Sequence, residues 1–128
     1  MNANEREFVE ELAHQCIGAA FEVSNELGVG FMEKVYENSL AHELRLRGLY
    51  VKQQEAMVVR YKGVVVGDYI PDLLIEDKLL VELKCVSSFA QEHLAQCLNY
   101  LKGTGLSLCL LFNFQKSKVE FKRIVLDL

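Results

Sequence analysis

The amino-acid sequence predicts an α/β fold, a central mixed β-sheet flanked by helices, with the elements in the order α-α-β-β-β-α-β-β. Three observations support this prediction. Apolar residues recur at helical spacing over residues 1–47, valine-, isoleucine- and leucine-rich runs follow from Val51, and one more helical segment separates these from two final apolar runs. A chain that mixes helices and strands in this way favours packing of the helices on the faces of a sheet.

Two helices are expected at the beginning of the chain. Asn4, followed three residues later by Glu7, resembles an N-terminal cap for the first helix, and Gly28 is a suitable end. The apolar stripe of this helix consists of Leu12, Cys16, Ala19, Val23 and Leu27. The second helix is expected over residues 33–47, and Gly48 closes it.

Strand-like segments follow the two helices. Valine-rich runs on both sides of Lys62-Gly63 predict a hairpin, and a second hairpin is expected from residues 71–75 and 79–84. The remaining elements are a helix over about residues 88–102, closed by Gly103 and Gly105, and strands over residues 106–114 and 119–126.

Composition is typical of one soluble globular domain over residues 1–128. Hydrophobic residues make up 51% and charged residues 25%, a balance that argues against disorder. No apolar run is long enough to span a bilayer, and the polar, acidic start is unlike a targeting peptide, so a cytoplasmic location without a membrane partner is expected. The four cysteines include no C-x-x-C pair, which favours reduced thiols over a zinc site at Cys85, His93 and Cys97.

The net charge of −4 is unevenly distributed, because acidic residues are concentrated in the first third of the chain. A polyanion would therefore approach the C-terminal part, although charge alone does not indicate nucleic-acid binding. Two small groups of basic residues could contact phosphates: Arg45, Arg47 and Lys52 form one, and Lys116, Lys118, Lys122 and Arg123 form the other.

The second hairpin carries the residues with the clearest chemical potential. Glu82 and Lys84 are two apart on one strand, so their side chains share a face of the sheet. A three-residue turn at residues 76–78 would place Asp72 opposite Glu82. A two-residue turn would instead place Asp72 opposite Leu83 and scatter the group, because a shift of one residue reverses the face.

Two neighbouring carboxylates resist ionisation unless a cation lies between them. Asp72 and Glu82 are hard oxygen ligands that suit Mg²⁺ or Mn²⁺, and the Leu83 carbonyl could supply a third ligand. Such a metal could polarise a phosphoryl oxygen while Lys84 holds the attacking water or the phosphate. The alternative is a solvated strand face that carries an ordinary Glu–Lys pair.

These residues resemble the motif of the PD-(D/E)XK nuclease superfamily, with Pro71-Asp72 followed by Glu82-Leu83-Lys84. The stretch from Gly30 to Tyr36 matches the G-x-x-E-x-x-Y pattern of one branch, the GxxExxY proteins. Gln96 and Tyr100 resemble the Q-x-x-x-Y arrangement of RecB-like nucleases. The resemblance extends from about Ile17 to Val125, and it implies a restriction-endonuclease-like core.

The resemblance also implies a role for each matching residue. Asp72 and Glu82 would bind the metal, and Lys84 would be the catalytic lysine. A glutamate on a helix completes the site in many of these nucleases. Glu37 is similar to the helix-borne glutamate of archaeal Holliday-junction resolvases. Glu33 and Tyr36 are the second choice, and both glutamates lie beside Tyr36 on the expected helix.

Gln96 and Tyr100 are four residues apart on the expected third helix and therefore share a face. That face could contact a phosphate or orient Lys84. Without the resemblance, Tyr100 would be read as a core residue and Gln96 as its solvated neighbour.

The expected function is that of a Mg²⁺- or Mn²⁺-dependent nuclease that hydrolyses phosphodiester bonds in nucleic acid, DNA more than RNA. A small acidic chain would need a homodimer or a protein partner to hold a duplex. The alternatives are a non-catalytic nucleic-acid-binding or assembly module that retains the fold, and a purely structural metal site.

Overall fold

The computed structural model describes residues 1–128 and contains three helices and seven strands. The helices are α1 (Ala3–Leu27), α2 (Glu33–Leu46) and α3 (Gln91–Thr104). The strands are β1 (Val51–Gln53), β2 (Met57–Tyr61), β3 (Val64–Tyr69), β4 (Leu73–Ile75), β5 (Leu79–Lys84), β6 (Leu108–Asn113) and β7 (Glu120–Val125). None of the helices is both long and apolar enough to cross a membrane.

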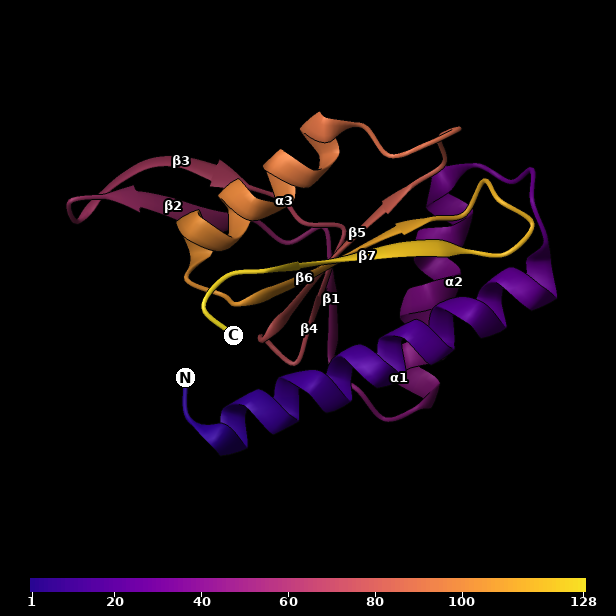
Figure 1. Ribbon diagram of the computed structural model, residues 1–128, viewed down its shortest axis with the longest axis horizontal. Helices are drawn as coiled ribbons and strands as arrows, with labels where there is room; N and C mark the ends of the chain where they lie inside the picture. Colours follow the sequence, from indigo (N-terminus) through magenta and orange to yellow (C-terminus); the bar gives the residue numbers. More distant parts are fainter.

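Five strands form the central sheet, in the order β1-β4-β5-β6-β7, and β2 and β3 form a separate two-stranded sheet. The β5–β6 pair is parallel and its crossover passes through α3, whereas the other pairs are antiparallel. Figure 1 shows α1 and α2 on one side of the sheet and α3 with the β2–β3 hairpin on the other. The predicted fold class is therefore confirmed.

The predicted number of strands is wrong: the predicted order has three before the third helix, the two predicted hairpins require four, and the structure has five. The strand without a predicted range is β1, whose three residues are too few for a clear alternating pattern, whereas β4 lies within the predicted strand 71–75. The other difference is the β2–β3 hairpin, which leaves the central sheet. Its two-residue turn at Lys62 and Gly63 has positive φ at both positions, as a type I′ turn requires.

The β4–β5 register decides which side chains share a face. Leu73 pairs with Val81 and Ile75 pairs with Leu79, so the connecting turn contains three residues, as predicted. Glu76 and Asp77 accommodate this turn in the left-handed region, with φ values of 52° and 56°. The same register, continued by one residue, brings Asp72 opposite Glu82.

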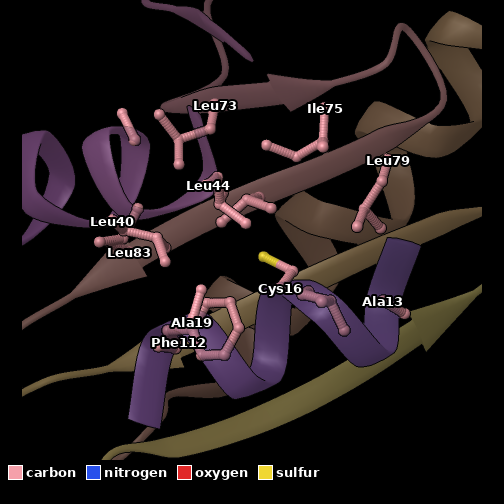
Figure 2. Close-up of a cluster of buried hydrophobic side chains, with 14 of the residues drawn as sticks. Ala13, Cys16, Ala19, Leu40, Leu44, Leu73, Ile75, Leu79, Leu83 and Phe112 are labelled. Carbon is pink, nitrogen blue, oxygen red and sulfur yellow. The ribbon is translucent and has the colours of Figure 1, made fainter. Parts of the chain in front are cut away.

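Because successive side chains of β5 point to opposite faces of the sheet, the strand contributes to two separate apolar clusters. Val81 and Leu83 belong to the larger cluster, beneath α1 and α2, whereas Leu80 belongs to the smaller cluster, beneath α3. Figure 2 shows the larger cluster, where Cys16 and other small residues of α1 face leucines from α2, β4 and β5. All four cysteines are free thiols, as expected.

The helix boundaries differ from the predictions by a few residues. The N-cap of α1 is Asn2 rather than Asn4, and its side chain accepts a hydrogen bond of 2.8 Å from the Glu5 amide. Helix α1 ends at Gly28 as predicted. Helix α3 begins at Gln91, three residues later than expected, and ends at Gly105 in the left-handed conformation.

Candidate active site

Asp72 and Glu82 meet where β4 begins and β5 ends. The backbone amide of Asp72 donates to Glu82 Oε1 at 3.2 Å, and the backbone amide of Leu83 donates to Asp72 Oδ2 at 2.8 Å. The predicted proximity of the two carboxylates is therefore present in the structure. Each carboxylate is fixed by a backbone donor of the neighbouring strand, which limits its rotation.

Glu82 is a buried carboxylate, with 8% of its surface exposed. Burial and, second, the charge of Asp72 raise its pKa to about 8. Hydrogen bonds from the Tyr69 hydroxyl, at 2.6 Å, and from the Asp72 amide oppose this rise. At neutral pH, Glu82 is thus mostly protonated, and a bound cation would have to displace its proton.

Lys84 is the last residue of β5 and is partly exposed. It lies two residues after Glu82, on the same face of the strand, and forms no ion pair in the structure. Its ammonium group lies near enough to Glu33 to lower the pKa of that side chain. Lys84 thus offers a free positive charge beside the carboxylates.

Helix α2 contributes both candidate glutamates. Glu37 is 4% exposed, and its Oε2 atom accepts from Lys34 Nζ at 3.0 Å and from Gln53 Nε2 at 2.9 Å. Glu33 lies in the first turn of α2, where desolvation and then the charge of Asp72 raise its pKa. The side chains of α2 therefore reach the same end of the sheet as Asp72.

The three carboxylates predicted to bind a metal do not converge on one point. No group of three or more His, Cys, Asp or Glu side chains is close enough to hold a metal ion. Instead, the amide nitrogen of Gln54 lies between Glu37 and Asp72, 2.8 Å from Glu37 Oε1 and 3.1 Å from Asp72 Oδ1. Asp72 contacts Glu82 directly and Glu37 through Gln54.

Tyr36, part of the second choice for the site, has a different environment. It is 1% exposed, and its ring stacks on Phe114 with centroids 4.8 Å apart. Its hydroxyl donates to the Gly28 carbonyl at 2.6 Å and accepts from the Phe31 amide at 3.3 Å. Tyr36 therefore stabilises the loop between α1 and α2, and it forms no hydrogen bond with Asp72, Glu82 or Glu37.

Gln96 and Tyr100 lie on α3 above the second carboxylate. Tyr100 is half-buried and stacks on Tyr69 with an angle of 18° between the rings. Desolvation raises its pKa, and the charge of Glu82 adds to the rise, whereas Gln96 opposes it. Tyr100 therefore approaches Glu82 through Tyr69, and Gln96 is exposed.

Two residues that the sequence analysis did not single out make direct side-chain contacts with Asp72 or Glu82. Tyr69, at the end of β3, donates to Glu82, and Gln54, directly after β1, donates to Glu37 and Asp72. Neither residue matches a motif. Both come to the site only through the path of the chain around the β2–β3 hairpin. An aromatic residue three positions before Asp72 was the only available sequence signal.

Most of the basic residues considered for phosphate binding have partners within the chain. Arg47 pairs with Glu43, Lys52 with Asp77 and Arg123 with Glu10, at 3.0, 2.7 and 2.7 Å. Arg45 donates to the Val51 carbonyl. His93 accepts from the Ala90 amide at 3.0 Å, which makes it a capping residue of α3.

The chemistry of the donor set fits a hard divalent cation. Asp72, Glu82 and Glu37 offer carboxylate oxygens, which Mg²⁺ and Mn²⁺ prefer. The raised pKa of Glu82 shows that its ionised form lacks stabilisation that a cation would supply, and the nitrogen between Glu37 and Asp72 shows that their oxygens can share one electropositive group. No thiol or imidazole contacts these carboxylates, so the site does not resemble a zinc site.

Comparison with known proteins places the chain in a family. The family model of the PD-(D/E)XK nuclease superfamily matches residues 10–124. The chain therefore belongs to the PD-(D/E)XK nuclease superfamily, and its fold is the restriction-endonuclease-like core that the sequence predicted.

Among solved structures, the chain is similar to an alkaline exonuclease, LHK-Exo, from Laribacter hongkongensis. The similarity has a TM-score of 0.49 at 16% identity and covers 84% of this chain and 76% of that chain. The complex of LHK-Exo with dAMP gives a TM-score of 0.49 at 15% identity, covering 90% and 83% of the two chains. A search of curated proteins gives no significant match.

Proposed function

We propose that this protein is a Mg²⁺- or Mn²⁺-dependent nuclease that hydrolyses phosphodiester bonds. Membership of the PD-(D/E)XK nuclease superfamily supports the reaction class. The observation that carries the proposal is the register that brings Asp72 against Glu82, with the unpaired Lys84 on the same face. An uncompensated pair of carboxylates beside a free lysine suits a metal-assisted hydrolysis.

In this proposal, the cation is held by Asp72 and Glu82, with Glu37 and the Leu83 carbonyl as further ligands. When bound, it would polarise a phosphoryl oxygen and favour ionisation of water. The backbone amide of Leu83 holds Asp72 in place, and Tyr69 holds Glu82. Lys84 orients the attacking water and offers its positive charge to the phosphate as negative charge increases there.

The helix residues have supporting roles in the proposal. Glu37 is favoured over Glu33 because it is buried and joined to Asp72 through Gln54. Tyr100 orients Glu82 through the Tyr69 ring, and the exposed Gln96 is available to a phosphate. Substitution of Glu33 by glutamine should therefore affect cleavage less than the same substitution of Glu37.

Membership of the GxxExxY branch of the superfamily is also a proposal. Gly30, Glu33 and Tyr36 match the pattern of the GxxExxY branch. The structure explains two of these residue types: Gly30 has a φ of 108°, which favours glycine, and the Tyr36 hydroxyl holds the loop between α1 and α2. DNA is the expected substrate rather than RNA. A homodimer or a protein partner is expected to contribute to holding it, because the chain is small and has a net charge of −4.

Cleavage of labelled single-stranded, duplex and branched DNA, with and without Mn²⁺ or Mg²⁺, tests the activity. Lys84→Ala should reduce cleavage by at least a hundredfold while the circular dichroism spectrum stays unchanged, because the variant removes one charge at the surface of the fold. Lys102→Ala, which changes an exposed lysine near the end of α3, outside both groups of basic residues, is the matched control. Cleavage that needs no metal, or that survives in Lys84→Ala, would contradict the proposal.

A second function is favoured by the ion pairs of the basic residues. Because Arg47, Lys52 and Arg123 contact carboxylates of the same chain, three of the seven basic residues considered for phosphate binding are already paired. The protein would then be a nucleic-acid-binding or assembly module that keeps the fold without turnover. Cleavage that is abolished by Asp72→Asn but retained in Asp68→Asn, an exposed aspartate on β3, would reject this alternative.

A further inference from the structure

The residue Gln54 occupies an unusual backbone conformation directly after β1. Its φ is 53°, in the left-handed region that residues other than glycine seldom adopt. Its backbone amide donates to the Asp72 carbonyl at 3.1 Å, which continues the pairing of β1 with β4 by one residue. The backbone of Gln54 is thus tied to the same residue that its side chain contacts. Strain held in this way is frequent at functional sites.

The side chain of Gln54 contacts one oxygen of each of two carboxylates. Its Nε2 atom lies 2.8 Å from Glu37 Oε1 and 3.1 Å from Asp72 Oδ1, and neither oxygen accepts any other hydrogen bond. The second oxygen of each carboxylate is already held, by Lys34 and Gln53 for Glu37 and by the Leu83 amide for Asp72. The amide nitrogen therefore occupies the position between the two oxygens that are available to a cation.

Gln54 is also free to leave this position. The residue is exposed, so rotation of its side chain would place the amide in water and would not uncover an apolar core. The neutral amide can satisfy two carboxylate oxygens but cannot neutralise their charge. A divalent cation would therefore compete with the amide for the same two oxygens.

We propose that Gln54 is a positioning residue that holds Glu37 and Asp72 together in the metal-free protein and is displaced by the divalent cation. This inference rests on the proposed metal-dependent function and adds to it the residue that limits metal affinity. In the metal-free protein, the amide keeps two like charges in place. When the cation binds, two hydrogen bonds to charged groups must break, and this lowers the affinity.

The test is titration calorimetry of Mn²⁺ into metal-free wild type, Gln54→Ala and Gln53→Ala, with melting temperatures measured in EDTA. Gln54→Ala should bind Mn²⁺ about tenfold more tightly, because no hydrogen bonds are lost on binding. Its melting temperature in EDTA should fall by several degrees. A merely structural role would lower both stability and affinity. Gln54→Asn tolerates the left-handed backbone and is too short to span the carboxylates, so it provides a second variant with the same expectation.

Gln53→Ala is the matched control, because Gln53 contacts Glu37 but not Asp72. Its Mn²⁺ affinity should stay within about twofold of the wild type. Equal or weaker affinity in both Gln54 variants, an equal gain in Gln53→Ala, or no binding by any of these proteins would overturn the inference. Binding by the wild type that Asp72→Asn abolishes, without a gain in the Gln54 variants, would overturn only the role of Gln54 and leave the proposed function standing.

Discussion

Glu82 combines two conditions that oppose ionisation, burial and a neighbouring carboxylate. A group of this kind destabilises the folded protein when it is charged, unless a cation approaches it. A divalent cation would stabilise the ionised form of Glu82 and displace its proton, so metal binding should strengthen as pH rises. Stability and metal binding should therefore respond to pH in opposite ways.

The first prediction concerns stability without metal. The carboxyl pKa of Glu82 is about 8 in the folded protein and about 4.3 in an unfolded chain, so between these values the folded state holds the extra proton. Stability should then decrease as pH rises through this window, by up to about 1.4 kcal/mol per pH unit. Urea unfolding in EDTA from pH 5.5 to 8.5 measures the slope. The pH slope of the free energy of unfolding should be smaller in Glu82→Gln than in the exposed control Glu7→Gln. Equal slopes in the two variants would contradict the attribution of the slope to Glu82.

The second prediction concerns Tyr69, whose hydroxyl stabilises the charged form of Glu82. Tyr69→Phe keeps the ring that stacks on Tyr100 and removes only the hydrogen bond. Because the pKa of Glu82 then rises further, Mn²⁺ affinity should fall several-fold, and more at pH 6.5 than at pH 8.5. Calorimetry at the two pH values is the measurement. Tyr61→Phe, on the exposed hairpin, should bind as the wild type does, and an equal loss at both pH values would argue against an effect through Glu82.

The connection between α1 and α2 depends on one hydroxyl group. Tyr36 binds the carbonyl of Gly28, the residue that ends α1, and the amide of Phe31. Tyr36→Phe keeps the stacking on Phe114 but leaves these backbone groups without their partner. The free energy of unfolding should fall by about 1–2 kcal/mol, measured by urea unfolding with Tyr50→Phe, an exposed tyrosine, as the control. A change below about 0.5 kcal/mol would show that water replaces the hydroxyl.

Local sequence rules predicted the elements that depend on neighbouring residues. The three-residue turn before β5, the end of α1 at Gly28 and the hairpin at Lys62-Gly63 are all present. The cap of α1 was wrong by two residues because Asn2 and Asn4 are both followed by a glutamate three positions later. The strand that was not given a range, β1, is too short for its pattern to be visible.

Only the part of the site that lies on the β4–β5 hairpin could be predicted from the sequence. Asp72 and Glu82 belong to adjacent strands, so their proximity follows from turn length. The contacts of Gln54 and Tyr69 depend on how β1 and the β2–β3 hairpin pack around that pair, which no local pattern encodes. Similarly, both candidate glutamates lie on α2, and only packing shows that Glu37 is buried while Glu33 stays at the surface.

The molecule as a whole has a firmly packed sheet and a loosely attached hairpin. Every residue of β6, and every residue of β5 except Lys84, is buried, whereas most of β2 and β3 is exposed. Amide protons of β5 and β6 should therefore exchange with solvent only through global unfolding. Those near the hairpin turn should exchange through local opening, at least a hundredfold faster. Native-state hydrogen exchange followed by mass spectrometry tests this difference, and equal protection in the two regions would contradict it.

The turn at the far end of the β2–β3 hairpin is a suitable place to insert a peptide tag. In Figure 1 the turn between β2 and β3 extends away from the central sheet, on the side opposite to the end of β5. Lengthening an exposed turn costs little, about 0.6 kcal/mol for each doubling of its length. A peptide tag inserted between Lys62 and Gly63 could therefore anchor single molecules to a surface with the carboxylate edge facing the solution.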